Sequence, residues 1–453
     1  MITYPIIVRN FNKSDISYFK AFQSLIMILI AVIPLGTKQL FISAPKNLKE
    51  ERWKVTFLIT ISVSLLLILI ININNSWIMN ILGTQYSFIN SNILTLIILL
   101  ASLKTLFITL LTSKIDFKTI SIALIIKQLC FYSAVIVIAF CKKIPGILIY
   151  LVIMAEILEV VILALKIYSK RIRFLPKKKV NFFLDKVAVK YISFIGSEQI
   201  FNVLALHFPS IFVIFLMGSK LAPEFQLPFY AINIPASLIM MSVAKVLFPY
   251  NSEYRENSMM RKTYRTVIFA LTFIMVPVLI SIFILNKEIV SILFQPDWIY
   301  AMQAVRIFPI MIFVNVISNP FSTIPNIKEK PQIMFIYSLV LFALRMSALY
   351  FGYTIFGFIG AVVAFTIADA VVRLMKLKID LQLIEYKILD FLNNIKLNLF
   401  AGGIYLISFF ILKLVLPKYI ALSASLLFCL VFIVLTQKQR IINLLHKVKM
   451  ERK

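Results

Sequence analysis

Long apolar runs, separated by short polar and basic segments, make up most of this chain of 453 residues. Thirteen runs are long enough, or nearly so, to cross the ~30 Å hydrocarbon core of a bilayer as helices. A membrane β-strand needs only ~9–11 residues, so the length of the runs favours helices. The pattern predicts an all-α, polytopic helical membrane protein. The runs cover residues 21–43, 55–73, 88–111, 119–140, 145–165, 191–217, 226–247, 264–285, 300–321, 333–352, 356–375, 397–416 and 419–436.

The segments between the runs differ sharply in basic residues. Residues 166–190 hold nine Lys or Arg among 25 residues, and such residues stay on the cytoplasmic side of a membrane. With this stretch inside and alternation in both directions, the inner segments hold roughly 30 Lys and Arg and the outer segments roughly five. The asymmetry predicts a multi-pass protein of a bacterial inner membrane with its C-terminus in the cytoplasm.

Thirteen crossings with a cytoplasmic C-terminus place the N-terminus outside. The first 20 residues nevertheless carry Arg9, Lys13 and Lys20, and no signal peptide precedes them. We therefore expect one more helix before residue 1, or that Met1–Val8 is the remnant of a lost first span. The alternative is a thirteen-span protein whose short N-terminus is translocated.

Counting that further helix gives fourteen spans, with six before the basic stretch and eight after it. We expect two lobes of six helices around a central cavity, plus two C-terminal helices. The expected parts are an N-lobe at 1–165, a basic cytoplasmic linker at 166–190, a C-lobe at 191–375, and two extra spans with a basic tail at 376–453.

Composition excludes several classes of function. Hydrophobic residues are 61% and charged residues 15%, against about 45–50% and 25% in soluble domains. The net charge of +28 is spread between apolar runs, so membrane lipid and not nucleic acid is the expected counter-charge. No HExxH, P-loop or GxSxG motif occurs, and no outer loop is long enough for a catalytic domain. We expect a transporter without cofactor or metal, and not an enzyme.

Ionisable residues inside the runs are the candidate functional groups, because they are costly there and mark substrate or ion pathways. Cations outnumber anions, which favours a cavity that attracts an anionic headgroup such as a diphosphate. The expected anion contacts are Lys104, Arg345 and Arg306, and the candidates for ion coupling are Glu156, Asp369 and His207. Glu156 and Glu159 are three residues apart and share a helix face. The alternative is a purely structural role. Residues towards the cytoplasmic side, among them Lys127, Asp369 and Arg373, would then extend to the membrane surface or form ion pairs with one another.

Four stretches resemble the Wzx-type polysaccharide flippases. They are LAPEFQLPFYAINIPASLIMMSVAKVLFPYNSEY at 221–254, PDWIYAMQAVRIFPIMIFVNVISNPF at 296–321, GFIGAVVAFTIAD at 357–369 and VRNFNKSDISYF at 8–19. The last is similar to the segment that follows the first transmembrane helix in that family. The chain departs from the family in its N-terminus and its low glycine content, and no single functional residue transfers.

The resemblance implies the multidrug/oligosaccharidyl-lipid/polysaccharide exporter superfamily, which works by alternating access. It implies a flippase for a polyprenyl-diphosphate-linked oligosaccharide in cell-surface polysaccharide or lipopolysaccharide (O-antigen) synthesis. The expected partners are membrane lipid, that glycan substrate, and a glycan polymerase or other polysaccharide-assembly proteins. The alternatives are a small-molecule antiporter of the same fold, a MurJ-like flippase for the peptidoglycan precursor, and an integral-membrane glycan polymerase or ligase.

Overall fold

The described part of the chain is almost entirely helical. Within it no residue lies in a β-strand, and ten helices are long and apolar enough to cross a membrane. The prediction of an all-α, polytopic membrane protein is confirmed, while the number of crossings stays a prediction. The computed structural model describes residues 4–42, 44, 48–73, 91–140, 146–176, 189, 191–253, 256–294, 297–328, 330–429, 431–432 and 435–436. The predicted outer loop 74–87, most of the linker after residue 176, and the tail after residue 436 lie outside these ranges.

The chain forms two compact units. Unit 1 comprises Met1–Gln226, Leu293–Gln295 and Pro331–Tyr350, and unit 2 comprises Leu227–Ile292, Pro296–Lys330 and Phe351–Lys453. The lobe boundaries expected from the sequence stay predictions.

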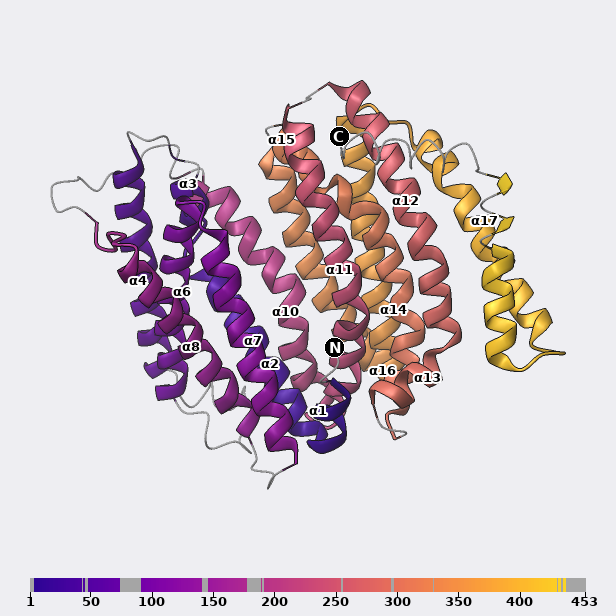
Figure 1. Cartoon of the computed structure of the whole chain (residues 1–453), viewed down its shortest axis with the longest axis horizontal. Helices are drawn as coiled ribbons and strands as arrows, with labels where there is room; N and C mark the ends of the chain where they lie inside the picture. The colour runs from indigo at the N-terminus through magenta and orange to yellow at the C-terminus, as the bar shows by residue number, and fades with distance from the viewer. Residues whose placement is uncertain are drawn as a thin grey trace. The chain divides into compact units, whose positions relative to one another are not determined.

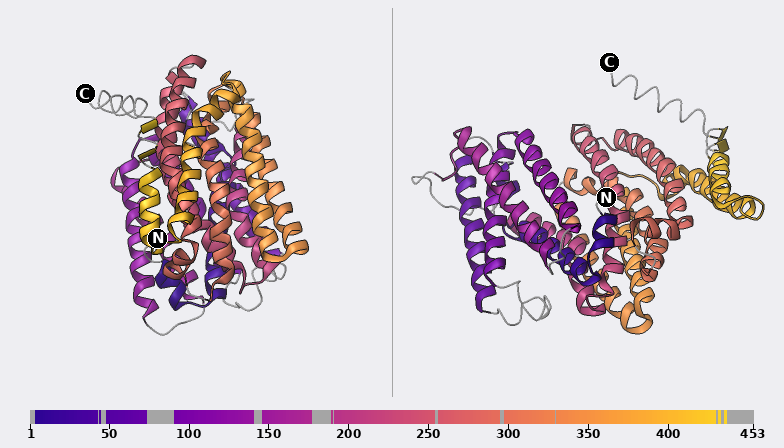
Figure 2. Two further views of the ribbon diagram at one scale, coloured as in Figure 1. Left: turned by 90° about the vertical axis from the view of Figure 1, so that its right-hand side faces the viewer. Right: turned by 60° about the horizontal axis from the view of Figure 1, so that its bottom comes forward.

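Unit 1 holds the first helices of the chain, drawn from indigo to magenta in Figure 1. Within it α4 packs against α6, α6 against α8, and α8 against α7, and the right-hand view of Figure 2 shows this group from a second direction. The helices are α1 (Tyr4–Asn10), α2 (Lys13–Val32), α3 (Thr37–Ile42), α4 (Lys49–Ile73), α6 (Ser91–Ser113), α7 (Phe117–Ala139), α8 (Ile147–Ser169), a π-helical turn (Tyr191–Gly196) and α10 (Ser197–Met217).

Unit 2 is a second bundle in which α12 packs against both α14 and α17. Its interior is rich in aromatic rings, such as Tyr264 stacked on Phe321 with centroids 4.5 Å apart. The helices of this part are α11 (Ala222–Glu253), α12 (Asn257–Ile284), α13 (Asn286–Leu293), α14 (Ile299–Ser318), a 3-10 turn (Asn319–Thr323), α15 (Ile324–Ile327), α16 (Pro331–Leu383), α17 (Ile388–Leu412) and a short apolar helix (Lys418–Cys429). The first residues of α11 and α16 and the end of α13 belong to unit 1.

Positive φ angles interrupt the helices at two places. The apolar run predicted at 21–43 is two helices, because Leu35 and Gly36 have φ of 44° and 74° between α2 and α3. Inside α16, Gly357 has φ 65° and ψ −153°. A Cβ on Gly352 would lie 2.8 Å from the Cβ of Ala364, whereas a straight helix would separate the two residues by ~18 Å. The chain therefore reverses direction at Gly357, one residue into the second of the two apolar runs predicted at 333–352 and 356–375.

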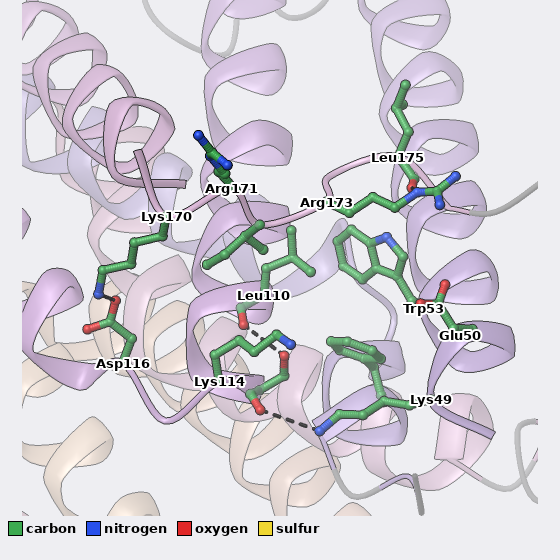
Figure 3. A pocket seen from close by; sticks show the side chains of 13 residues that line it. Lys49, Glu50, Trp53, Leu110, Lys114, Asp116, Lys170, Arg171, Arg173 and Leu175 are labelled. Atoms are coloured by element: carbon green, nitrogen blue, oxygen red, sulfur yellow. Dashed lines mark hydrogen bonds and ion pairs between the residues drawn. The ribbon is translucent and has the colours of Figure 1, made fainter. Parts of the chain in front are cut away.

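The core of unit 1 places two groups of charged side chains at different depths along the same helices. Apolar residues from α4, α6 and α8, including Trp53, Phe107, Leu110 and Leu163, fill the space between these helices. At one end of them the chain surrounds a cavity of about 670 Å3 (Figure 3). The second group lies in the middle of α6, α7 and α8, about halfway along each helix.

Candidate functional site

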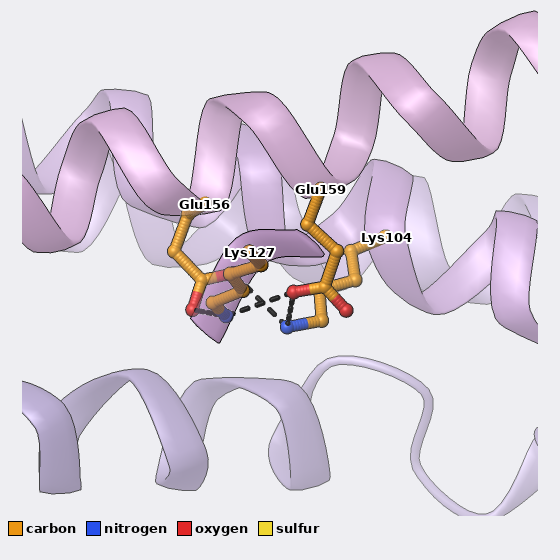
Figure 4. Close-up of polar contacts among 4 residues, drawn as sticks. All are labelled: Lys104, Lys127, Glu156 and Glu159. Atoms are coloured by element: carbon orange, nitrogen blue, oxygen red, sulfur yellow. Dashed lines mark hydrogen bonds and ion pairs between the residues drawn. The ribbon is translucent and has the colours of Figure 1, made fainter. Parts of the chain in front are cut away.

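Four ionisable side chains meet in the middle of three neighbouring helices of unit 1. We call Lys104 of α6, Lys127 of α7, and Glu156 and Glu159 of α8 the ion tetrad (Figure 4). All four residues are between 2% and 9% exposed. The surrounding sequence is mostly apolar and rich in Leu and Ile, so the tetrad is a polar island inside apolar helices.

The geometry of the tetrad is a closed ring of ion pairs. The Nζ of Lys104 lies 3.0 Å from Oε2 of Glu156 and 2.6 Å from Oε2 of Glu159. The Nζ of Lys127 lies 2.8 Å from Oε2 of Glu159 and also contacts Oε1 of Glu156. Each charge therefore has two partners of opposite sign, and the tetrad is neutral overall. This neutrality matters, because two carboxylates on one helix face repel each other unless cations lie between them.

The depth of these residues explains why they meet. Lys104, Lys127 and Glu159 each lie nine or ten residues, or ~15 Å, from the end of their helix at which the cavity opens. That depth is half the ~30 Å thickness of a hydrocarbon core. Three antiparallel helices of equal length thus bring lysines and glutamates to one level.

Two residues to which the sequence analysis assigns different roles form an ion pair in the structure. Lys104 was expected to contact an anion and Glu156 to couple an ion, and the structure places the two in one ion pair. Lys127 and Glu159 were not among the expected site residues. The signal that identifies them is their equal depth in adjacent helices, which becomes readable once the helix ends are known.

The other expected residues of unit 1 lie on α10 and on the first part of α16. Arg345 is 1% exposed, and its guanidinium donates a hydrogen bond to the backbone carbonyl of Ala205 in α10. His207 follows two residues later in α10 and is half-buried. Helix α10 packs against α2, which contributes the buried Lys20.

Two expected residues belong to unit 2. Arg306 of α14 is exposed, and its guanidinium carbon lies 5.1 Å from the ring centroid of Phe283, a cation–π contact. Asp369 of α16 is fully buried and accepts a hydrogen bond of 2.8 Å from Nε of Arg373. Arg373 also donates to Oδ1 of Asn315 at 2.8 Å, so this aspartate is part of a satisfied polar network.

The tetrad has the means to exchange partners. Each lysine ammonium has three N–H donors and directs two of them at carboxylates, which leaves one for a further acceptor. An anion that reaches the lysines would release the glutamates, which then need a proton or a cation. Across the described residues, no three His, Cys, Asp or Glu side chains gather where they could hold a metal ion.

Comparison with protein families gives one match that covers more than half of the chain. Residues 18–303 match the profile of a family described as "Polysaccharide biosynthesis protein". The chain is also 23% identical over 217 residues to an "uncharacterized membrane protein in cps region" of Klebsiella pneumoniae. That match covers 44% of this chain and 45% of the relative, so it spans less than half of either protein.

Comparison with solved structures gives matches over nearly the whole chain. The lipid II flippase MurJ in an inward closed conformation is 14% identical, with a TM-score of 0.70 over 97% of this chain and 96% of that one. An inward-facing multidrug resistance MATE family transporter of the MOP superfamily is 13% identical, with a TM-score of 0.67 over 85% and 93%. At these identities the likeness shows the fold alone, which is a fold of membrane transporters and flippases.

Proposed function

Because the chain belongs to the family of polysaccharide biosynthesis proteins, we propose that it is a flippase for a lipid-linked oligosaccharide. The substrate is a polyprenyl-diphosphate-linked glycan that moves from the inner to the outer leaflet of a bacterial inner membrane by alternating access. The product serves cell-surface polysaccharide or lipopolysaccharide synthesis, with a glycan polymerase and other assembly proteins as partners. The chain is a transporter in this proposal, and its C-terminus is cytoplasmic.

The observation that carries the proposal is the combination of this family with a fold that extends over nearly the whole chain of a lipid flippase. The similarity to a membrane protein from a cps region also supports a role in polysaccharide synthesis. The ion tetrad adds a physical reason, because a translocated diphosphate is a ligand for the third N–H donor that each of its lysines keeps.

The tetrad suggests how substrate and coupling ion share one site. A diphosphate that binds Lys104 would displace the carboxylates of Glu156 and Glu159, which would then take up a proton or a cation. Substrate binding and ion binding thereby become linked at the tetrad. Arg345 and Arg306 are the further proposed anion contacts, and Asp369 and His207 the further proposed ion-coupling groups.

The direct test is transport in proteoliposomes that contain the purified full chain. A fluorescent polyprenyl-diphosphate oligosaccharide is placed in one leaflet, and its arrival in the other leaflet is measured with a membrane-impermeant quencher. Transfer faster than in protein-free liposomes supports the proposal. The absence of transfer in liposomes with correctly folded protein contradicts it.

Two further arms separate the alternatives that share the fold. Lipid II as substrate tests a peptidoglycan-precursor flippase, and a cationic dye with a proton gradient tests a small-molecule antiporter such as those of the MATE family. Transport of dye but not of lipid-linked oligosaccharide would favour the antiporter.

A neutral pair of substitutions tests the residues without unbalancing the charge. Lys104→Gln combined with Glu159→Gln keeps the tetrad neutral and removes one cation. We expect loss of surface glycan at a normal level of membrane-inserted protein. Lys118→Gln, which removes an exposed lysine of α7, is the matched control and should leave the glycan unchanged.

A further inference from the structure

The cavity at the ends of α4, α6, α7 and α8 is lined by more basic than acidic side chains. Lys49 begins α4, Lys114 follows α6, and Lys170, Arg171 and Arg173 follow α8. Five cations from three separate places in the chain therefore line one space, against the two carboxylates of Glu50 and Asp116. Figure 3 shows these side chains around the cavity.

The protein neutralises only part of this charge. Lys170 pairs with Asp116, Nε of Arg173 donates to the carbonyl of Leu175 at 3.2 Å, and Nζ of Lys49 is 3.4 Å from the carbonyl of Ser113. Within the described ranges, the side chains of Lys114 and Arg171 have neither a hydrogen bond nor an ion pair. The cavity thus keeps an excess of positive charge.

The helix dipole explains some of these positions but not their convergence. Lys114 and Arg171 follow the C-terminal ends of α6 and α8, where the partial negative charge favours a cation. Lys49, in contrast, is the first residue of α4, where the partial positive charge disfavours one. Its Nζ reaches the carbonyl of Ser113 at the C-terminal end of α6, so a third ammonium turns towards the same space.

The remaining walls are apolar and fixed. Trp53 is buried, and its indole N–H donates to the carbonyl of Phe174 at 3.0 Å, so the ring orientation is set. Phe41 lies beside it with ring centroids 5.1 Å apart, and Leu175 at the rim is 63% exposed. The volume of about 670 Å3 is within the ~300–1,000 Å3 of ligand pockets.

We propose that this cavity binds the phosphate or diphosphate group of an anionic lipid at the membrane surface. Basic pockets between transmembrane helices on the cytoplasmic side are suited to lipid headgroups. The exposed apolar rim at Leu175 favours a lipid over a soluble phosphate, because a lipid covers it with its glycerol and first methylenes. This site does not depend on the proposed transport function, since a regulatory or structural lipid needs only the cavity.

The test measures binding to the delipidated full chain in a non-ionic detergent. The probes are phosphatidylglycerol, phosphatidylcholine and inorganic diphosphate, and the readouts are lipid adducts in native mass spectrometry and thermal stabilisation. We expect phosphatidylglycerol to bind more tightly than phosphatidylcholine. Binding of diphosphate without phosphatidylglycerol would overturn the assignment to a lipid, and binding of neither would overturn the site.

A pair of charge-matched variants locates the site. Lys114→Gln with Arg171→Gln removes two cations that line the cavity. Lys118→Gln with Lys166→Gln removes two exposed cations of α7 and α8 that do not line it. We expect the first variant to bind phosphatidylglycerol about 25-fold more weakly, at about fivefold per lost charge, and the second to bind like wild type. Equal affinity in the two variants would overturn the proposal.

A measurement on the unmodified protein covers the case in which the first variant does not fold. An amine-reactive reagent should label Lys114 more slowly when phosphatidylglycerol is present, while Lys118 should keep its rate. Mass spectrometry of the peptides gives both rates in one sample. Equal slowing at the two lysines would mean that the lipid only screens the surface, which contradicts a specific site.

Discussion

Replacement of Lys127 by methionine should destabilise the ion tetrad strongly. The substitution keeps a long apolar chain in α7 and removes one of two cations. Glu156 and Glu159 would then share the single ammonium of Lys104, which leaves a net charge of −1 among residues that are at most 9% exposed. The consequence is an uncompensated charge inside a spanning helix.

The magnitude follows from the geometry. Two unit charges ~4 Å apart attract by about 4 kcal/mol at an effective dielectric constant of ~20. Lys127 makes two such contacts and also repels Lys104, so the net electrostatic loss is about 4 kcal/mol. Removal of one partner from a buried ion pair typically costs about 3–5 kcal/mol, which agrees with this value.

The assay is a double-mutant cycle on the apparent free energy of unfolding. Unfolding in mixed detergent micelles of increasing SDS content gives this quantity for each variant. Lys127→Met and Glu159→Gln should each destabilise by about 3–5 kcal/mol. The double variant restores neutrality, so its loss should be at least about 2 kcal/mol smaller than the sum of the two single losses.

The control for this cycle is Lys118→Met, which removes an exposed lysine near the start of the same helix. A surface substitution of this kind changes stability by less than about 0.5 kcal/mol. Additive losses in the double variant would refute the reasoning, because they would mean that the two residues do not share one charge balance.

Three further predictions concern other parts of the chain. Gly360→Ala should destabilise by about 1–3 kcal/mol in the same SDS titration, because its Cβ would lie 2.3 Å from the carbonyl oxygen of Gly352, in the part of α16 before the reversal. Gly403→Ala meets nothing within 4 Å and should be neutral or stabilising. The hydrogen bond from Lys170 holds the pKa of Asp116 below its usual range. The pair therefore contributes to folding stability above about pH 4, and this stability is lost as the pH falls through the lowered pKa. Wild type and Lys170→Met should therefore differ in stability by less than about 1 kcal/mol at about pH 6 and converge once the pH is below the lowered pKa, and a difference that persists in that acid range would contradict this. Ser169→Cys, in a chain without its native cysteines, should react with an impermeant maleimide only after the cells are permeabilised, and labelling of intact cells would reverse the predicted topology.

The long helices were predictable from sequence because an apolar run of about 20 residues has few structural outcomes in a membrane. Their ends were less so, because helices continue beyond the apolar run into polar segments. Helix α12 begins at Asn257 and α17 at Ile388, seven and nine residues before the runs predicted at 264–285 and 397–416. The polar residues at these starts continue the helical hydrogen bonding into a region where hydropathy gives no signal.

The site was only partly predictable. Sequence identified Lys104 and Glu156 as costly buried charges, because each interrupts a long apolar run. It could not pair them, since the pairing depends on which helices are neighbours and on how each is rotated about its axis. Lys127 shows the difficulty. A lysine near a helix end could extend its side chain to the membrane surface, whereas Lys127 lies in the middle of α7 and therefore needs a charged partner inside the bundle.

The tetrad also has a consequence for how the protein is made. Helices α6 and α7 precede α8 in the chain, so both lysines reach the membrane before their glutamates do. A lysine at the centre of a helix disfavours insertion by about 2.5–3.5 kcal/mol. That penalty is relieved only when α8 arrives with two carboxylates at the same depth. Insertion of α6, α7 and α8 is therefore completed as a group of three, and a nascent chain that stops before Ile147 holds two lysines in lipid without a counter-charge.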